Sequence, residues 1–276
     1  MKFSGELFTF EKESNLVAFE SGLVTDKTVV FIGGLGDGLN AVPYLEPLEE
    51  SLTSFGWSLT QVQLSSSFNG YGTSNLQTDC QQLDALVDHL TTERGKKQIV
   101  FLGHSTGSQD CYWHNKYGQN RILGYILQAP VSDREHLEQN LDNFQENLKA
   151  AITLREQGKG LELLPRSVFW VPVTADRFYS LAAKGGDDDV FSTDLSDQEI
   201  LFRFKDVNDP ICWVYSENDE FYASKLPKQQ VIERFQSLIP AIQTAVIVPE
   251  GDHSITKKAS QDYFVSVVKD FIQKLS

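Results

Sequence analysis

An apolar stretch that stops at a Gly-x-Ser-x-Gly sequence limits most strongly what this chain can fold into. The run "QIVFL" at 98–102 has the β-branched and large apolar residues of a buried strand. It continues directly into "GHSTG" at 103–107 and a helix-like pattern after it. A tight strand-to-helix turn needs small neighbours, which Gly103 and Gly107 supply. Ser105 is therefore either part of a loop rich in small residues or a nucleophile held on a sharp turn.

The rest of the chain alternates between strand and helix patterns. Residues 5–10 and 16–21 alternate in hydropathy and predict an opening hairpin. Further strands, separated by helices, are predicted at 27–32, 57–64, 98–102 and 122–130. Their continuous apolar character is typical of strands with helices on both faces. The sequence thus predicts an α/β fold with a mostly parallel, doubly wound sheet.

The alternation stops at Pro130 and resumes near residue 206. Residues 133–160 read as one long polar helix, and residues 161–197 as an irregular piece. Strand patterns return in "PICWVYS" and "TAVIVPE". We therefore predict a core made of residues 1–130 and 206–276. Residues 131–205 would form a helical lid or cap inserted between two strands.

A serine hydroxyl becomes a useful nucleophile only when a base removes its proton. Asp219 and His253 each follow a predicted strand, in the order nucleophile, acid, base. The carboxyl ends of parallel strands meet at one edge of a sheet, so Ser105, Asp219 and His253 should meet there. Glu217 and Glu220 are alternatives for the acid. We favour Asp219, because a turn directly after the strand can aim it at an imidazole.

Acyl transfer also needs two N–H donors for the developing oxyanion. The backbone of Thr106, the residue after the serine, is one candidate. The second is expected in the glycine-rich loop "FIGGLGDG" at 31–38, from Leu35 or Gly34. A phosphate-binding role for this loop is weaker, because the G-K-[ST] ending of a P-loop is missing.

The net charge restricts the partners. Lys and Arg total 24 and Asp and Glu total 38, which gives a net charge of −14. Such a surface repels phosphate backbones and anionic lipids, so neither nucleic acid nor a membrane is expected as the main partner. No apolar stretch approaches the roughly 20 residues of a membrane helix, and no signal peptide is visible. Oligomeric state is not indicated.

Three cysteines, Cys80, Cys111 and Cys212, form no C-x-x-C pair. An odd number argues against a disulfide framework or a zinc site, so we expect reduced core thiols in a cytoplasmic protein. We expect no metal and no cofactor. His104 should pack or form hydrogen bonds. The remaining histidines in helix patterns should be structural or solvated: His89, His114 and His136.

The predicted insertion carries two further candidates for substrate contacts. Asp187, Asp188 and Asp189 form either a solvated loop or helix start, or an acidic lip that favours substrates with amines. Ser196 followed by Glu199 is a capping-box pattern. Some of the insertion's aromatic residues should line a substrate pocket and the others should pack the lid onto the core: Phe169, Trp170, Phe178, Tyr179 and Phe191.

With these residues in view, "GHSTGSQD", "YSENDEF" and "EGDHS" resemble the α/β-hydrolases. More specifically, the chain resembles a fungal α/β-hydrolase family that carried only an unknown-function label. That family includes hydrolases of fusarinine-type siderophore esters. The supporting stretches, which span most of the chain, include "FIGGLGDGLNAVPYLEPL", "PVTADRFYSL" and "GGDDDVFSTDL". The resemblance implies an intracellular serine esterase with Ser105 as nucleophile, Asp219 as acid and His253 as base.

The sequence therefore predicts a serine hydrolase that cleaves a carboxylic ester of a small molecule through an acyl-enzyme. A siderophore ester is one such substrate. Two alternatives remain at this point. One is a binding or regulatory protein on a hydrolase scaffold, because a fold does not fix a function. The other is a thioesterase or an amidase with the same three side chains.

Overall fold

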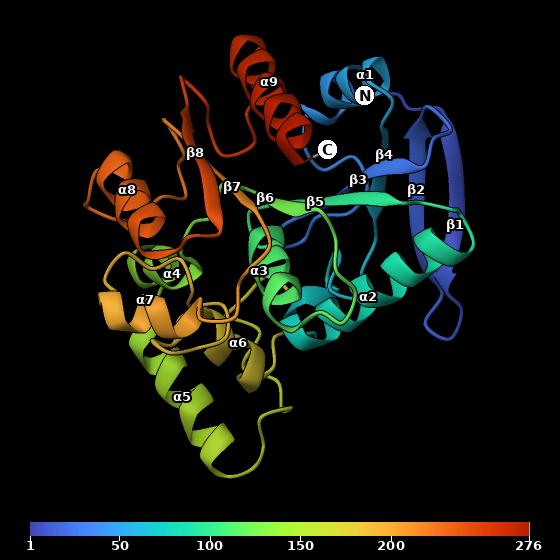
Figure 1. The fold of residues 1–276 in the computed structure, drawn as a ribbon. Coiled ribbons are helices and arrows are strands. Elements are labelled where there is room, and N and C mark those ends of the chain that lie inside the picture. The colour runs from blue at the N-terminus through green and yellow to red at the C-terminus, as the bar shows by residue number, and fades with distance from the viewer. Residues whose placement is uncertain (276) are drawn as a thin grey trace.

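One mixed sheet of eight strands organises the computed structural model, which describes residues 1–275 (Figure 1). The strand order is β1-β2-β4-β3-β5-β6-β7-β8. β2 is antiparallel to both its neighbours, and the other adjacent pairs are parallel. The strands are β1 (Gly5–Glu11), β2 (Leu16–Gly22), β3 (Lys27–Ile32), β4 (Ser58–Val62), β5 (Gln98–His104), β6 (Gly124–Gln128), β7 (Ile211–Ser216) and β8 (Ile242–Val248).

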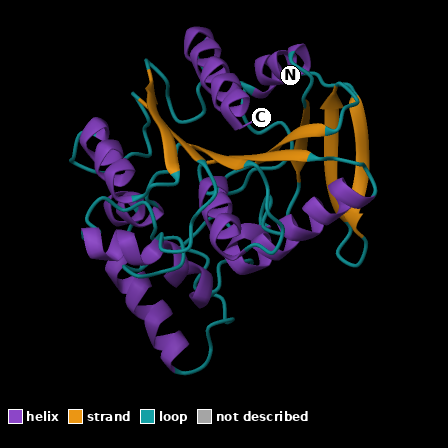
Figure 2. Cartoon of the chain, in the orientation of Figure 1, coloured by secondary structure: helices purple, strands orange, loops and turns teal. Residues whose placement is uncertain are grey.

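Helices cover both faces of this sheet (Figure 2). In Figure 1, α1 and α9 lie above the sheet and α2 and α3 lie below it. A short 3-10 turn, η1 (Gly70–Gly72), precedes α2. The helices are α1 (Leu45–Ser54), α2 (Leu76–Thr92), α3 (Gly107–Tyr117), α4 (Asp133–Asn140), α5 (Phe144–Glu156), α6 (Ala175–Ala182), α7 (Asp197–Arg203), α8 (Lys228–Leu238) and α9 (Lys258–Leu275).

Alternate side chains of the central strands enter two separate cores. In β3, Val29 and Phe31 belong to the core that includes residues of α1 and α9, whereas Val30 and Ile32 belong to the core that includes residues of α2, α3 and α8. All four are essentially inaccessible to solvent. Strands buried on both faces must be apolar at every position, which explains the continuous apolar runs in the sequence.

The segment between β6 and β7 differs from the sequence prediction in two ways. The predicted single helix over 133–160 is two helices, α4 and α5, because the chain turns at 141–143. Asn143 there has φ +52°, a left-handed conformation that a continuous helix does not contain. The piece predicted to be irregular, residues 161–197, holds α6, and α7 begins at its last residue. Ser196 and Glu199 form the expected capping box at the start of α7.

This segment has a small core of its own, which includes Phe144, Val168 and Phe178. Figure 1 shows its helices grouped below the β7–β8 end of the sheet. The boundaries at 131 and 205 fall in the connections that join it to β6 and β7. Below we call residues 131–205 the inserted segment.

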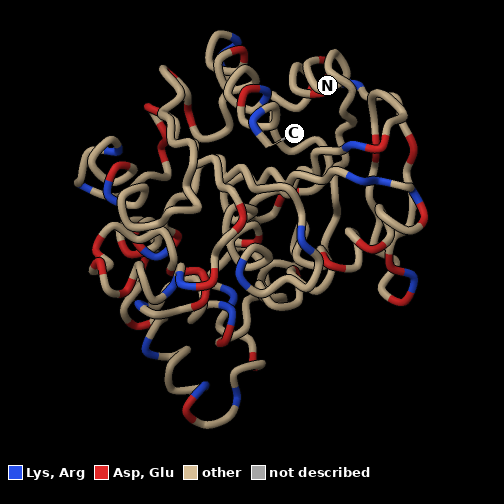
Figure 3. The backbone as a smooth tube through the Cα atoms, in the orientation of Figure 1, with Lys and Arg blue, Asp and Glu red and all other residues tan. Residues whose placement is uncertain are grey.

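Charged residues are not confined to one part of the fold, and the cysteines lie inside it. Acidic and basic residues are scattered along the whole chain (Figure 3). Cys80, Cys111 and Cys212 are buried and free. Within residues 1–275, none of the helices combines the length and the apolar character needed to cross a bilayer.

Candidate active site

Ser105 occupies a strained turn between β5 and α3. Its φ is +54°, a left-handed value that is unfavourable for a residue with a side chain. A Cβ on Gly103 would lie 2.0 Å from the carbonyl oxygen of Gly107, and one on Gly107 would lie 2.3 Å from that of Ile32. Only glycine fits these two positions. The spacing in the sequence therefore reflects the close packing that holds the serine at the end of β5.

Asp219 and His253 meet at the same edge of the sheet, after β7 and β8. His253 Nδ1 lies 2.8 Å from Asp219 Oδ1, and both residues are buried. Glu220 instead accepts a hydrogen bond from the backbone N–H of His253, and Glu217 accepts one from that of Glu250. Of the three acids considered, Asp219 is thus the one hydrogen-bonded to the imidazole.

A cavity of about 430 Å³ opens at this edge. Ser105 and His253 both line it, so the structure brings the serine and the imidazole to one space. Gly34 and Leu35, from the loop after β3, line it as well. A Cβ on Gly34 would approach the Cβ of Ser105 to 2.8 Å, so this loop passes directly beside the serine.

The candidate oxyanion donors differ in availability. The Gly34 N–H donates to Asp37 Oδ2 at 2.8 Å, so it is already engaged in this structure. Within residues 1–275, the N–H groups of Leu35 and Thr106 donate to no other group. These two remain as candidates. Burial raises the pKa of Asp37.

A hydrogen-bonded group beside His253 was not singled out by the sequence reasoning. Gln128, the last residue of β6, accepts hydrogen bonds from His104 Nδ1 at 2.5 Å and Tyr44 Oη at 3.1 Å. Its amide donates to the carbonyl of His253 at 3.0 Å. A polar residue at the end of an apolar strand was the available signal. His104 forms hydrogen bonds, as predicted.

His104 stays neutral in this arrangement. Burial, and to a smaller extent the neighbouring His253, lowers the pKa of His104 to about 3. The two imidazole rings lie 4.9 Å apart between centroids. Because Gln128 presents its oxygen, the His104 proton is on Nδ1. A neutral ring therefore packs against His253 without adding a second positive charge.

The five aromatic candidates divide into two groups. Phe169 and Trp170 line the cavity. Phe178 and Phe191 are fully buried in cores. The guanidinium of Arg155 lies over the ring of Tyr179, with Arg155 Cζ 3.7 Å from the ring centroid. None of these three lines the cavity, so their expected substrate contact is not supported.

The acidic-lip prediction is wrong for Asp188 and Asp189, whereas Asp187 is exposed but does not line the cavity. Asp188 and Asp189 are 1% and 2% exposed and form ion pairs within the inserted segment. Asp188 Oδ2 lies 2.6 Å from Arg177 Nη1, and Asp189 Oδ1 lies 2.9 Å from Arg134 Nε. These carboxylates hold the segment together and cannot face a substrate.

The three histidines expected to be structural or solvated differ in their contacts. His89 stacks on Phe8, and His114 Nδ1 lies 2.8 Å from the hydroxyl of Tyr125, in line with structural roles. His136 instead lines the cavity, which the sequence reasoning missed. It also missed Tyr71, Asp133 and Phe221 as lining residues. Within residues 1–275, no group of His, Cys, Asp and Glu side chains is suited to hold a metal ion.

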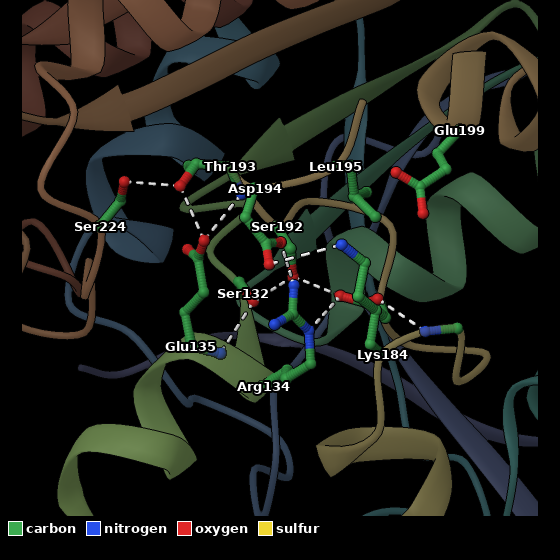
Figure 4. A network of polar contacts seen from close by, with 12 residues as sticks. Ser132, Arg134, Glu135, Lys184, Ser192, Thr193, Asp194, Leu195, Glu199 and Ser224 are labelled. Carbon is green, nitrogen blue, oxygen red and sulfur yellow. Dashed lines mark hydrogen bonds and ion pairs between the residues drawn. The ribbon is translucent and has the colours of Figure 1, made fainter. Parts of the chain in front are cut away.

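A polar network joins the start of α4 to the loop that carries Asp219 (Figure 4). Arg134 pairs with Asp189 and Asp194. Glu135 accepts hydrogen bonds from the backbone and hydroxyl of Thr193, whose hydroxyl lies 2.6 Å from Ser224 Oγ. The inserted segment is thus connected through charged and polar contacts to the chain that follows β7.

Comparison with known proteins gives one family and several relatives. A family described as "Protein of unknown function (DUF1749)" matches residues 1–275. A UPF0613 protein of Schizosaccharomyces pombe is 33% identical and covers 96% of this chain and 95% of its own. The fusarinine C esterase sidJ of Aspergillus fumigatus is 25% identical, with 94% of this chain and 93% of its own covered.

Solved structures show the same fold. The siderophore hydrolase EstB from Aspergillus fumigatus superposes with a TM-score of 0.83 at 24% identity, covering 99% of this chain and 98% of that one. A monoglyceride lipase from Saccharomyces cerevisiae superposes with a TM-score of 0.68 at 11% identity, covering 100% and 96%. The predicted α/β-hydrolase fold is confirmed by these likenesses.

Proposed function

This chain belongs to the DUF1749 family, and from that membership and the site geometry we propose that it is a serine hydrolase that cleaves a carboxylic ester. Ser105 is the proposed nucleophile, His253 the base and Asp219 the acid. The observation that carries the proposal is the 2.8 Å contact between His253 and Asp219, in the cavity that Ser105 also lines.

The proposed mechanism follows from which atoms are already engaged. Asp219 accepts the Nδ1 proton of His253, so the Nε2 lone pair is the one left to take the proton of Ser105. The serine oxygen attacks the ester carbonyl, and the Leu35 and Thr106 N–H groups hold the oxyanion. His253 then protonates the leaving alcohol. Water, deprotonated by the same ring, releases the acid from the acyl-enzyme.

Two named relatives support the ester as the bond cleaved. Relatives include an esterase of Emericella nidulans and the fusarinine C esterase of Aspergillus fumigatus. We therefore propose a siderophore ester as a candidate substrate. The inserted segment would act as the cap over the site. The cytoplasm is the proposed location, because the three cysteines are free.

Labelling with a fluorophosphonate tests the nucleophile. The wild-type protein should be labelled and Ser105→Ala should not. Hydrolysis of 4-nitrophenyl butyrate by Ser105→Ala should fall by about three orders of magnitude or more, because the covalent route is lost. Ser254→Ala removes another hydroxyl from the same cavity and should keep the label.

The same experiment separates the alternatives. An unlabelled, inactive wild-type protein would contradict the proposal and favour a binding or regulatory protein. Label without ester turnover, but with turnover of a thioester or an anilide, would favour a thioesterase or an amidase. Mass spectrometry of fusarinine C incubated with wild type and Ser105→Ala tests the siderophore substrate directly.

A further inference from the structure

Carboxylates line the cavity, and within residues 1–275 no Lys or Arg does. The two carboxylates are Asp37 and Asp133. Asp37 is engaged by the N–H of Gly34 in the loop beside Ser105. Asp133, the first residue of α4, is bound through Oδ2 by the neutral amide of Gln109 at 2.6 Å. The Asp133 charge is therefore not balanced by a cation at the cavity wall.

Further acidic residues accumulate behind Asp133. Asp79, Asp110 and Asp188 are buried around one guanidinium, that of Arg177. Arg177 is itself paired with Asp188. One oxygen of Asp110 and one of Asp188 are buried with no hydrogen-bond donor. Counting Asp133, four carboxyl groups lie around one internal cation. Burial raises the pKa of Asp79 to about 6 and that of Asp110 well above its usual value, and Arg177 is paired with Asp188, so Asp133 has no cation of its own.

The pKa of the Asp133 carboxyl group reflects the lack of a cationic partner. Burial first, and then the negative charge of Asp188, raise the pKa of Asp133 to about 7. A carboxylate taken out of water without a cationic partner is unfavourable for folding. A carboxyl group in a cavity wall whose pKa is shifted by burial and by a neighbouring charge is a candidate for a functional role.

Aromatic rings stand at the same cavity. Tyr71 packs against Phe169 and Trp170, with ring centroids 6.3 Å and 5.7 Å from its own. The carbonyl of Tyr71 accepts a hydrogen bond from Arg177, so these rings adjoin the acidic group. Aromatic faces attract cations, especially quaternary ammonium groups, and they also pack against the apolar parts of an ester.

We propose that Asp133, with the rings of Tyr71, Phe169 and Trp170, forms a subsite for a positively charged, ammonium-type group of the substrate. This inference rests on the proposed function for the chemistry at Ser105, but the charge selection belongs to Asp133. The substrate class is thus an ester that carries a cationic group away from the bond that is cleaved.

The subsite should strengthen as Asp133 loses its proton. The groups that face it come from several elements: Gln109 of α3, Arg177 of α6, Asp188 of the inserted segment, and His253, with Tyr71, His136, His104 and Asp37 at the cavity wall. Burial lowers the pKa of His136, as it does that of His104. Asp79 of α2 and Asp110 of α3 lie around the same guanidinium, and burial raises the pKa of both, that of Asp79 to about 6. A pH-dependent preference for a cationic ester is therefore assigned to Asp133 only where Asp133→Asn abolishes it.

A pair of isosteric esters isolates the charge. The 4-nitrophenyl esters of 6-(trimethylammonio)hexanoate and of 7,7-dimethyloctanoate differ by a nitrogen in place of a carbon. Wild type should have a kcat/KM about tenfold higher for the cationic ester at pH 8. That ratio should fall as the pH is lowered through 7. The cationic ester keeps its charge at every pH, and effects of His253 on turnover cancel in the ratio.

Asp133→Asn should reduce the ratio to about one at every pH. The amide keeps an oxygen that can accept the Gln109 hydrogen bond. Glu138→Gln removes an exposed charge from the same helix and should leave the ratio at the wild-type value. A wild-type ratio near one, or a ratio that Asp133→Asn does not change, overturns the subsite.

Failure of the proposed function gives a different result. If neither ester is hydrolysed and Ser105 takes no fluorophosphonate, the hydrolase proposal has failed. Calorimetric binding of the same two esters to wild type then tests the subsite alone. About tenfold tighter binding of the cationic ester, increasing through pH 7, supports it. Equal binding overturns it, and this measurement does not depend on whether Asp133→Asn folds.

Discussion

At the scale of single residues, the surroundings of Ser105 leave no room for side chains. Its φ of +54° persists because Gly103 and Gly107 allow the backbone of β5, α3 and β3 to come together. The tight strand-to-helix turn at Ser105 was predicted from the size and position of these two glycines alone. It could not predict that Gly34 is used by Asp37, because that depends on where a side chain three residues later folds back.

Gly34→Ala tests this crowding. The new Cβ would lie 2.8 Å from the Cβ of Ser105 and 3.2 Å from the His104 carbonyl, so the loop after β3 must move. We expect kcat/KM for 4-nitrophenyl butyrate to fall by about 10- to 100-fold, because the Leu35 N–H moves with the loop.

Gly56→Ala is the matched control for this prediction. Gly56 has φ +87° and nothing within 4 Å of an added Cβ. The substitution should lower the free energy of unfolding by about 1 kcal/mol through backbone strain and leave kcat/KM unchanged. Equal activity of Gly34→Ala and wild type would show that the loop position does not matter for turnover.

At the scale of elements, the inserted segment departs most from its sequence pattern. Three consecutive acidic residues are usually solvated, yet Asp188 and Asp189 are buried. Their partners, Arg177 and Arg134, are 11 and 55 residues away in the sequence. Local composition contains no information about such pairing. The turn at Asn143 was missed for a related reason, because the polar pattern of α4 and α5 continues through it.

Arg177→Leu tests whether the buried pair holds the segment. It would leave Asp188 without its cation, and breaking one side of a buried ion pair costs about 3–5 kcal/mol. We expect that loss in the free energy of unfolding, measured with urea. Cleavage by a protease within residues 131–205 should also become faster.

Two further variants make this prediction specific. Arg177→Leu combined with Asp188→Leu should recover part of the loss, because no charge is then left buried and unpaired. Lys258→Ala breaks an exposed pair with Asp262 on α9 and should cost less than about 0.5 kcal/mol. A loss for Arg177→Leu as small as that for Lys258→Ala would contradict the structural role.

At the scale of the whole molecule, the mostly parallel, doubly wound sheet was the most predictable feature. Each central strand is apolar on both faces, and the α/β alternation allows few arrangements. The meeting of Asp219 and His253 followed from that topology. The cavity wall did not, because Asp133, Tyr71 and His136 reach it from α4 and η1, and only the three-dimensional packing of the inserted segment puts them there.

The charge in the cavity should also affect the stability of the whole chain. The pKa of Asp133 is about 7 in the folded protein, against an ordinary value of 3.8. Between these values the folded state holds a proton that the unfolded state has released, so stability falls as pH rises from about 4 to about 7. Asp133→Asn cannot titrate. The free energy of unfolding of Asp133→Asn should therefore rise relative to that of wild type by about 1–2 kcal/mol between pH 5 and pH 8, after allowance for solvent in the cavity.

Urea unfolding at the two pH values measures this difference, with Glu138→Gln expected to follow wild type. If the Asp133→Asn and wild-type values stay parallel, the carboxyl group ionises as freely in the folded chain as in the unfolded one, and no charge is stored at the cavity wall for a cationic substrate to balance.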